Sequence, residues 1–163
     1  MGWYSLLTAG HCFHDDAGKV VKPRFVTVNG QGTCEVSRLV DDNRDHVILT
    51  VTGCKFPIHV AISQKAPKQG DQVFMWGNPL FFTDLIRFGT YSGHGYLPLT
   101  ADEAGLFTNE LMWFDLASTF GDSGSGIFNA QTGELIGVLS IGTDPMTRPF
   151  HMAGAFPLAF TRK

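Results

Sequence analysis

The sequence has little net charge, few cysteines and no long apolar run, and each of these absences excludes a class of protein. The net charge is -3, and Lys and Arg are scattered, so neither nucleic acid nor a membrane surface is expected as a partner. No stretch is apolar over a length that could span a bilayer, and residues 3–8 are too short and too polar for a signal peptide. With 44% hydrophobic and 17% charged residues, the composition is that of an ordinary globular protein.

Cysteine is scarce as well. The three cysteines, Cys12, Cys34 and Cys54, are odd in number and form no Cys-x-x-Cys pair, which argues against a full disulfide framework and against a structural zinc site. We expect all three to be reduced, buried thiols. His11 and His14 flank Cys12, but no second ligand pair follows, so neither a metal nor a cofactor is predicted.

Glycine and proline, in contrast, are abundant, and patterns with the period of a long helix are few. Nineteen glycines and eight prolines predict many short strands joined by turns, which is typical of an all-β protein. Residues 53–70 lose the alternating pattern and contain Pro57, Pro67 and several lysines, so this stretch is interpreted as a connection between two lobes. We predict an N-terminal lobe over residues 1–60 and a C-terminal lobe over residues 61–163.

Alternation of apolar and polar residues, interrupted by turn signals, defines the expected strands. Asn29 and Gly30 are a hairpin signal between the second and the third strand, and residues 93–95 (Gly-His-Gly) are expected to form a turn. The strands are expected at residues 3–8, 24–28, 33–40, 46–51, 71–76, 84–91, 106–114, 126–129, 134–142 and 150–156.

Residues 121–126 read Gly-Asp-Ser-Gly-Ser-Gly and are the most informative stretch. A serine between glycines on a tight turn can offer both its hydroxyl and nearby backbone N–H groups to a substrate carbonyl, because glycine reaches backbone angles that other residues avoid. This makes Ser123 a candidate nucleophile. Clusters of Gly, Ser and Asp are also ordinary turns, so the hexapeptide alone leaves both interpretations open.

Two further positions carry the residue types that an activated serine needs. His11 comes just past the end of the first expected strand, where loops on a rigid scaffold carry functional residues. Asp45 abuts the apolar run of the fourth strand, whereas Asp41 and Asp42 are interpreted as solvated turn residues. A serine hydroxyl needs a base within hydrogen-bond distance, and that base needs a third group to fix its tautomer and stabilise its charge. His11, Asp45 and Ser123 can fill these three roles.

Together these motifs resemble the chymotrypsin-like (trypsin-fold) serine proteases. Residues 8–12 read Thr-Ala-Gly-His-Cys, Asp45 heads an apolar strand and residues 121–124 read Gly-Asp-Ser-Gly, in the family's order of His, Asp and Ser. The resemblance implies a serine endopeptidase that cleaves a polypeptide substrate through an acyl-enzyme, with His11 as general base, Asp45 as its orienting partner and Ser123 as nucleophile. The backbone N–H groups of Gly121 and Ser123 would form the oxyanion hole.

The resemblance also implies a substrate pocket and a strand that pairs with the substrate backbone. Ser140 corresponds to a serine that hydrogen-bonds the aspartate and begins this strand, although a polar residue on a strand edge needs no such role. No acid stands at the pocket positions, and Leu139 replaces the histidine of glutamate- and glutamine-specific relatives, so Phe, Tyr, Leu or Met is expected ahead of the cut. His151 could reach this pocket from the last strand. The implied substrate-binding residues are Ala117, Ser118, Ser140, Ile141, Gly142 and Gly154.

The family has two six-stranded antiparallel β-barrels, and two strands precede the histidine strand in the first of them. Only ten residues precede His11, so we expect a first barrel without those strands and predict that self-association or an upstream segment covers its open edge. Activation by a freed N-terminus is for the same reason not expected. Small size and the absence of a secretory disulfide set resemble viral polyprotein-processing and bacterial HtrA-type members. The Gly-Asp-Ser-Gly-Ser form of residues 121–125 is similar to that of small viral proteases, which would work in the host cytoplasm. Residues 77–79 (Gly-Asn-Pro) weakly resemble bacterial HtrA-type members instead.

Two other functions fit parts of the pattern. A trypsin-fold chain with an incomplete first barrel can be a binding module without activity, but the presence of all three residue types favours the enzyme. An α/β-hydrolase requires Gly-x-Ser-x-Gly between a strand and a helix, with its histidine last in the chain. Residues 121–125 fail that pattern at the fifth position, and the only later histidine is His151.

Overall fold

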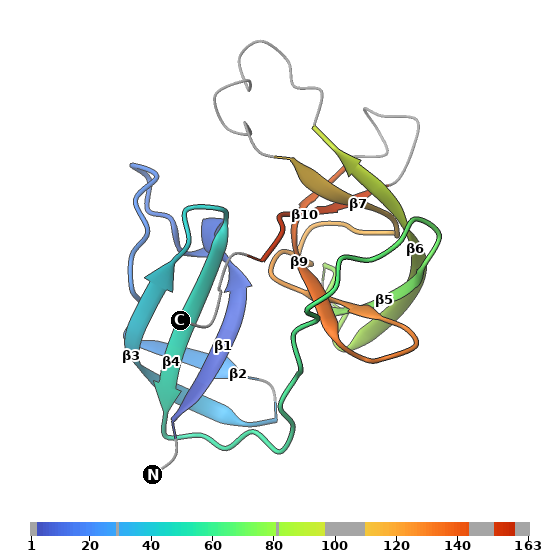
Figure 1. Cartoon of the computed structure of the whole chain (residues 1–163). Helices are drawn as coiled ribbons and strands as arrows, with labels where there is room; N and C mark the ends of the chain where they lie inside the picture. The colour runs from blue at the N-terminus through green and yellow to red at the C-terminus, as the bar shows by residue number, and fades with distance from the viewer. Residues whose placement is uncertain (1–2, 29, 81, 97–109, 144–151, 159–163) are drawn as a thin grey trace.

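The computed structural model describes residues 3–28, 30–80, 82–96, 110–143 and 152–158, and in these the chain is almost entirely β-structure. An open sheet and a closed barrel lie side by side (Figure 1), so the expected all-β class is confirmed. The strands are β1 (Tyr4–Ala9), β2 (Phe25–Val28), β3 (Gly32–Asp41), β4 (His46–Thr52), β5 (Gln72–Gly77), β6 (Leu85–Gly95), β7 (Leu111–Asp115), β8 (Gly126–Asn129), β9 (Leu135–Gly142) and β10 (Ala153–Ala155), and a 3-10 helix η1 (Gly10–Phe13) follows β1.

The first sheet is open at both ends in the described part of the chain. Its strand order is β1-β4-β3-β2, and every neighbouring pair is antiparallel. Strand β4 turns Val47, Leu49 and Val51 into the core, where they meet Val36 of β3. Four strands agree with the expectation of a first barrel that lacks two. That another segment or a second copy covers the open edge stays a prediction.

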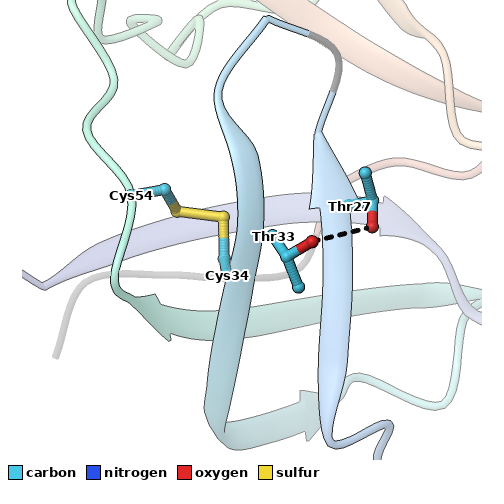
Figure 2. Close-up of a disulfide and its surroundings, with 4 residues drawn as sticks. All are labelled: Thr27, Thr33, Cys34 and Cys54. Atoms are coloured by element: carbon cyan, nitrogen blue, oxygen red, sulfur yellow. Dashed lines mark hydrogen bonds between the residues drawn. A yellow bond between two sulfur atoms is a disulfide. The ribbon is translucent and has the colours of Figure 1, made fainter.

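A disulfide ties the first sheet together. Cys34 on β3 bonds Cys54, which comes just after β4, and their Cα atoms are 5.4 Å apart (Figure 2). The expectation of three reduced, buried thiols is therefore wrong: only Cys12 is free, and it is exposed. The two cysteines are 20 residues apart in the sequence, and they meet because β3 and β4 align Glu35 with Thr52. Spacing along the sequence alone could therefore not reveal the pair.

The second unit is a closed barrel with the strand order β10-β7-β6-β5-β8-β9. Closure gives each strand a neighbour on both sides, although β9 extends past β8 at its C-terminal end. Its core is apolar, and its largest fully buried side chains come from four different strands. On these strands they are Val73, Met75, Leu111, Phe114, Ile127 and Val138, and Leu116 follows directly after β7.

Each of the ten expected strands overlaps an observed one. The turn expected at residues 93–95 is wrong, because β6 continues through them to Gly95 and pairs with β7. A bulge between Tyr91 and Gly93 explains the misreading: Gly93 has a φ of 135°, which glycine adopts at little cost, and the strand bends there without ending. Residues 106–109 and 150–151 of the expected strands lie outside the described part of the chain.

The unpatterned stretch after β4 does run from the sheet to the barrel (Figure 1). It also contacts the barrel on the way, because Ser63 N donates to Leu135 O and Leu135 N donates to Ala61 O, both at 2.8 Å. The boundary predicted between residues 60 and 61 stays a prediction. Among the residues described, no helix is long and apolar enough to cross a membrane.

Candidate active site

His11 and Asp45 meet at one end of the first sheet. Strands β1 and β4 are antiparallel, with Ala9 opposite His46, so the η1 helix after β1 adjoins the turn before β4. Nδ1 of His11 lies 2.8 Å from Oδ2 and 3.0 Å from Oδ1 of Asp45, and the backbone N–H of His11 donates to Oδ1 at 2.6 Å. None of these bonds uses Nε2, the ring nitrogen that a proton-transfer partner would need.

The pair is electrostatically coupled. The hydrogen bond with Asp45, followed by that with the adjacent Cys12 thiol, raises the pKa of His11 to about 10 against the opposing effect of burial. Burial alone raises the pKa of Asp45, but hydrogen bonds from the ring and backbone of His11, and from Ser140, lower it overall. The geometry therefore favours an imidazolium–carboxylate pair.

Asp42 supports the turn that carries Asp45. Its Oδ1 accepts the backbone N–H groups of Arg44 (2.8 Å) and His46 (3.1 Å), while its Oδ2 lies 2.8 Å from Nδ1 of the fully buried His46. Asp45 has a φ of 61°, which costs energy for a residue with a Cβ, so the turn depends on such support. The Asp42 side chain is only 6% exposed, and its interpretation as a solvated turn residue is wrong. Asp41 remains half-exposed.

Ser123 lies on the turn between β7 and β8 of the barrel, and its side chain is exposed. Gly121 and Gly124 have φ values of 94° and 84°, which give the turn its shape. A Cβ on Gly124 would overlap the Thr8 hydroxyl and come within 3.2 Å of Ala9 N. Because glycine stands there, the serine turn packs directly against the end of β1, next to the helix that carries His11.

Two backbone donors flank the serine hydroxyl. In the part of the chain that the structure describes, the N–H groups of Gly121 and Ser123 have no hydrogen-bond acceptor. The other N–H groups of the turn are used by backbone carbonyls: Asp122 donates to Thr119 (3.2 Å), Gly124 to Leu139 (2.9 Å) and Ser125 to Asp122 (2.9 Å). Two free donors beside an exposed hydroxyl are what the oxygen of an attacked carbonyl requires.

Ser123 and the His11–Asp45 pair border adjoining cavities. His11, Asp45 and Ser140 line a cavity of about 740 Å³, and Ser123 lines one of about 210 Å³ to which Ser140 also belongs. The two cavities therefore meet at Ser140. Among the hydrogen bonds of the described residues, none joins Ser123 to His11. The structure brings all three residues to one region of the surface, without a hydrogen bond between the serine and the histidine.

The smaller cavity contains four of the six residues predicted to bind substrate, namely Ser118, Ser140, Ile141 and Gly142. Gly154 is not among them, because it is buried in β10, where a Cβ would come within 2.6 Å of Ile141. Ala117 also lies outside the lining. Leu139 does line the cavity, and the Ser118 hydroxyl is buried there without a partner in the described chain. His151 lies outside the described residues.

An ion pair beneath the serine turn was not predicted from the sequence. Nη1 and Nη2 of Arg87, on β6, donate to the two carboxylate oxygens of Asp122 at 2.6 Å and 2.5 Å. The Asp122 side chain is completely buried. The available signal was an arginine between Ile86 and Phe88 in the expected strand of residues 84–91, since a buried carboxylate requires a counter-ion.

Comparisons with known proteins agree with this architecture. Residues 2–138 match the family model described as a trypsin-like peptidase domain. The fold is similar to that of the Rv3671c protease from M. tuberculosis in its active form, with a TM-score of 0.70 and 15% sequence identity. The match covers 94% of this chain and 64% of that one, so this chain spans less than two thirds of that protease. No curated protein matches the sequence significantly. From the family match and the chymotrypsin-like arrangement of its strands, the chain belongs to the trypsin-like peptidase family.

Proposed function

We propose that this protein is a serine endopeptidase that hydrolyses peptide bonds through an acyl-enzyme on Ser123. The proposal rests on the His11–Asp45 pair and the serine turn beside it. Nδ1 of His11 lies 2.8 Å from Oδ2 of Asp45, and the turn exposes Ser123 together with the free N–H groups of Gly121 and Ser123. An imidazole oriented by a carboxylate is the base that a serine hydroxyl requires. Membership of the trypsin-like peptidase family supports the same chemistry.

In the proposed reaction, Ser123 Oγ attacks the carbonyl carbon of the scissile bond and its proton passes to Nε2 of His11. The carbonyl oxygen becomes negatively charged and accepts hydrogen bonds from the N–H groups of Gly121 and Ser123. The C–N bond then breaks, and His11 donates the proton to the leaving amine. A water molecule next attacks the acyl carbon, gives a proton to His11 and releases the carboxylic acid, while the proton returns to Ser123.

The end of β9 supports substrate binding by strand addition. Strand β9 pairs with β8 only as far as Val138, whereas its pairing with β10 continues to Gly142. Within the described part of the chain, residues 140–142 therefore keep one unpaired side next to Ser123, where an extended peptide can add as a further strand. The apolar side chains of Leu139 and Ile141 in the adjoining cavity favour Phe, Tyr, Leu or Met ahead of the cut. Processing of a viral polyprotein stays a prediction from the sequence resemblance.

A binding module without peptidase activity is the second candidate function. One observation favours it: among the described residues no hydrogen bond joins Ser123 to His11, and an active serine would need that hydrogen bond. A protein of this kind would bind extended peptides along residues 140–142 without cleaving them. An HtrA-type quality-control protease, in contrast, would share the proposed chemistry and differ only in its substrates.

A fluorophosphonate probe separates the enzyme from the binding module. We expect stoichiometric labelling of the native chain, located on Ser123 by peptide mass spectrometry. Ser123→Ala removes the reactive hydroxyl and His11→Ala removes the base, so neither variant should be labelled. Ser5→Ala, an exposed serine of β1, is the matched control and should react like the native chain. A folded native chain that binds peptides but does not react would establish the binding module.

A further inference from the structure

We propose that Arg87 is a positioning residue: its ion pair with Asp122 holds the serine turn in the conformation that exposes the Ser123 hydroxyl and the two flanking N–H groups. The inference rests on the proposed function, because it concerns the same serine. It adds a residue from β6, a strand that contributes nothing to the three predicted catalytic positions.

The geometry of the Arg87–Asp122 ion pair makes it rigid. Two parallel bonds of 2.6 Å and 2.5 Å join the guanidinium of Arg87 to both oxygens of Asp122. The Arg87 side chain is 19% exposed and that of Asp122 is fully buried, so water screens the interaction little. A planar guanidinium in a bidentate contact fixes both the position and the plane of the carboxylate.

The pair also binds the backbone directly ahead of Asp122. Oδ2 of Asp122 accepts the N–H of Thr119 at 2.9 Å, and Asp122 N donates to the Thr119 carbonyl at 3.2 Å. Nη1 of Arg87 donates in addition to the carbonyl of Ala117 at 3.2 Å. The segment from residue 117 to residue 122 is thereby closed into a loop directly ahead of Ser123.

The end of β5 and the turn that follows it leave room for this ion pair. A Cβ on Gly77 would come within 2.6 Å of Oδ1 of Asp122 and 2.8 Å of Nη2 of Arg87, so only glycine leaves room for the pair. Leu80 N donates to the carbonyl of Phe120 at 2.7 Å, which holds the serine turn from the other side. Gly77 therefore has a structural reason within this chain.

Loss of Arg87 would leave a buried carboxylate without its counter-ion. Asp122 would then take up a proton or turn toward water, and either change weakens its bond to the Thr119 N–H and releases the loop. An arginine stays charged at every pH at which proteins fold. The counter-ion that positions the serine turn is thus supplied by the folded barrel itself and needs no cleavage of the chain.

The main test is the rate constant of fluorophosphonate labelling of Ser123 in Arg87→Ala. We expect a loss of about a hundredfold, the effect of a small displacement of reacting groups. Millimolar guanidinium chloride should restore part of the rate by occupying the vacated site, whereas sodium chloride at equal ionic strength should not. Arg38→Ala, which removes an exposed arginine of β3, is the matched control and should label at the native rate. Native-rate labelling of Arg87→Ala would overturn the proposal.

Arg87→Lys separates positioning from a merely structural role. A lysine keeps one charge but loses the bidentate contact, so its labelling rate should lie between those of the native chain and Arg87→Ala. Lysine also titrates, with an ordinary pKa of about 10.4, so the rate in this variant should fall again near that pH while circular dichroism stays unchanged. The native chain should show no such fall, and identical alkaline profiles would count against the proposal.

Hydrogen exchange tests the inference even if the proposed function fails. The N–H groups of Thr119 and Leu80 are bonded within the loop, and in Arg87→Ala they should exchange at least tenfold faster than in the native chain, with β5 and β8 unchanged. If the native chain does not react with the probe but this exchange pattern appears, the function is wrong and the positioning role stands. Equal exchange in both chains would refute the positioning role whatever the activity.

Discussion

The open sheet and the closed barrel contribute different halves of the candidate site. The sheet supplies His11 and Asp45, and the barrel supplies Ser123, the two N–H donors and the smaller cavity. The sheet ends in unpaired strands within the described chain and contains the Cys34–Cys54 disulfide, whereas the barrel closes on itself by hydrogen bonds. The disulfide therefore lies in the unit whose strands have fewer hydrogen-bonded neighbours.

In both halves, the same kind of contact holds the turn that carries a candidate site residue. In each, an aspartate accepts backbone N–H groups of its own turn and pairs with a cation-forming side chain: Asp42 with His46 in the sheet and Asp122 with Arg87 in the barrel. The partner in the barrel makes two bonds to the carboxylate, and the partner in the sheet is a histidine that makes one side-chain bond. We expect the sheet half to be the more sensitive of the two to pH, because the His11–Asp45 pair lies in it.

Among changes that keep both His11 and Ser123, Asp45→Asn is expected to have the largest effect, because it alters the base that the sheet contributes and leaves the barrel intact. An amide favours the wrong tautomer of His11, and the family's worked example gives a loss of about ten-thousandfold in kcat. Hydrolysis of a chromogenic peptide measures it. Asp41→Asn, at a half-exposed carboxylate of the same turn region, is the control and should be nearly silent. A larger effect at Asp41 would show that the wrong aspartate was chosen.

Replacing Cys34 and Cys54 together by Ala should destabilise the sheet more than any other change that spares the site. A closed loop of this length contributes about 3 kcal/mol through the entropy of the unfolded chain. The free energy of unfolding in urea measures the loss. Cys12→Ala, at the free and exposed thiol, should change that free energy much less. If the double variant is as stable as the native chain, the open sheet does not depend on its covalent tie.

Asp42→Asn should destabilise the protein by about 1–3 kcal/mol, because it leaves part of a buried hydrogen-bond set unsatisfied. The same change should lower kcat by releasing the turn that holds Asp45 in its left-handed conformation. Urea unfolding and peptide hydrolysis, each compared with Asp41→Asn, measure the two effects. The sequence alone predicted equal, negligible effects for Asp41 and Asp42, and finding them equal would argue against the supporting role of Asp42.

The His11–Asp45 pair should make both activity and stability depend on pH. The pKa of His11 is raised to about 10, so the stability from the pair is fully present below the unfolded value of about 6.5 and is lost as pH rises toward 10. Activity needs the neutral imidazole and should rise over the same range. Urea midpoints of the native chain and His11→Ala should therefore differ more at pH 6 than at pH 10. A constant difference would contradict the ion pair.

Cys12→Ala should have the smallest effect. The Cys12 thiol contributes to the raised pKa of His11 after Asp45 does, so its removal should lower that pKa and shift the rise of activity to lower pH. An NMR titration of the His11 ring in the two proteins measures the shift directly. The fold should not change, because the thiol is exposed. An unchanged titration would show that Asp45 alone sets the pKa.

The sequence by itself determined the strands and the candidate positions of the site. Alternating or continuous apolar segments between turn signals located each of the ten strands in the described part of the chain, because burial in a sheet is a local property of one strand. The motifs around His11, Asp45 and Ser123 were visible for the same reason, since each is a short contiguous stretch next to a strand end. Local patterns also misled at Gly93, where a bulge imitates a turn.

Only the tertiary structure decided which side chains meet. The Cys34–Cys54 disulfide and the Arg87–Asp122 ion pair join residues on different elements, and no local pattern encodes such pairs. Asp42 differs from Asp41 in the same way, because only its carboxylate reaches the buried ring of His46. Strand register and packing bring these partners together, and the low polarity of the interior then makes each buried charge depend on the partner it meets.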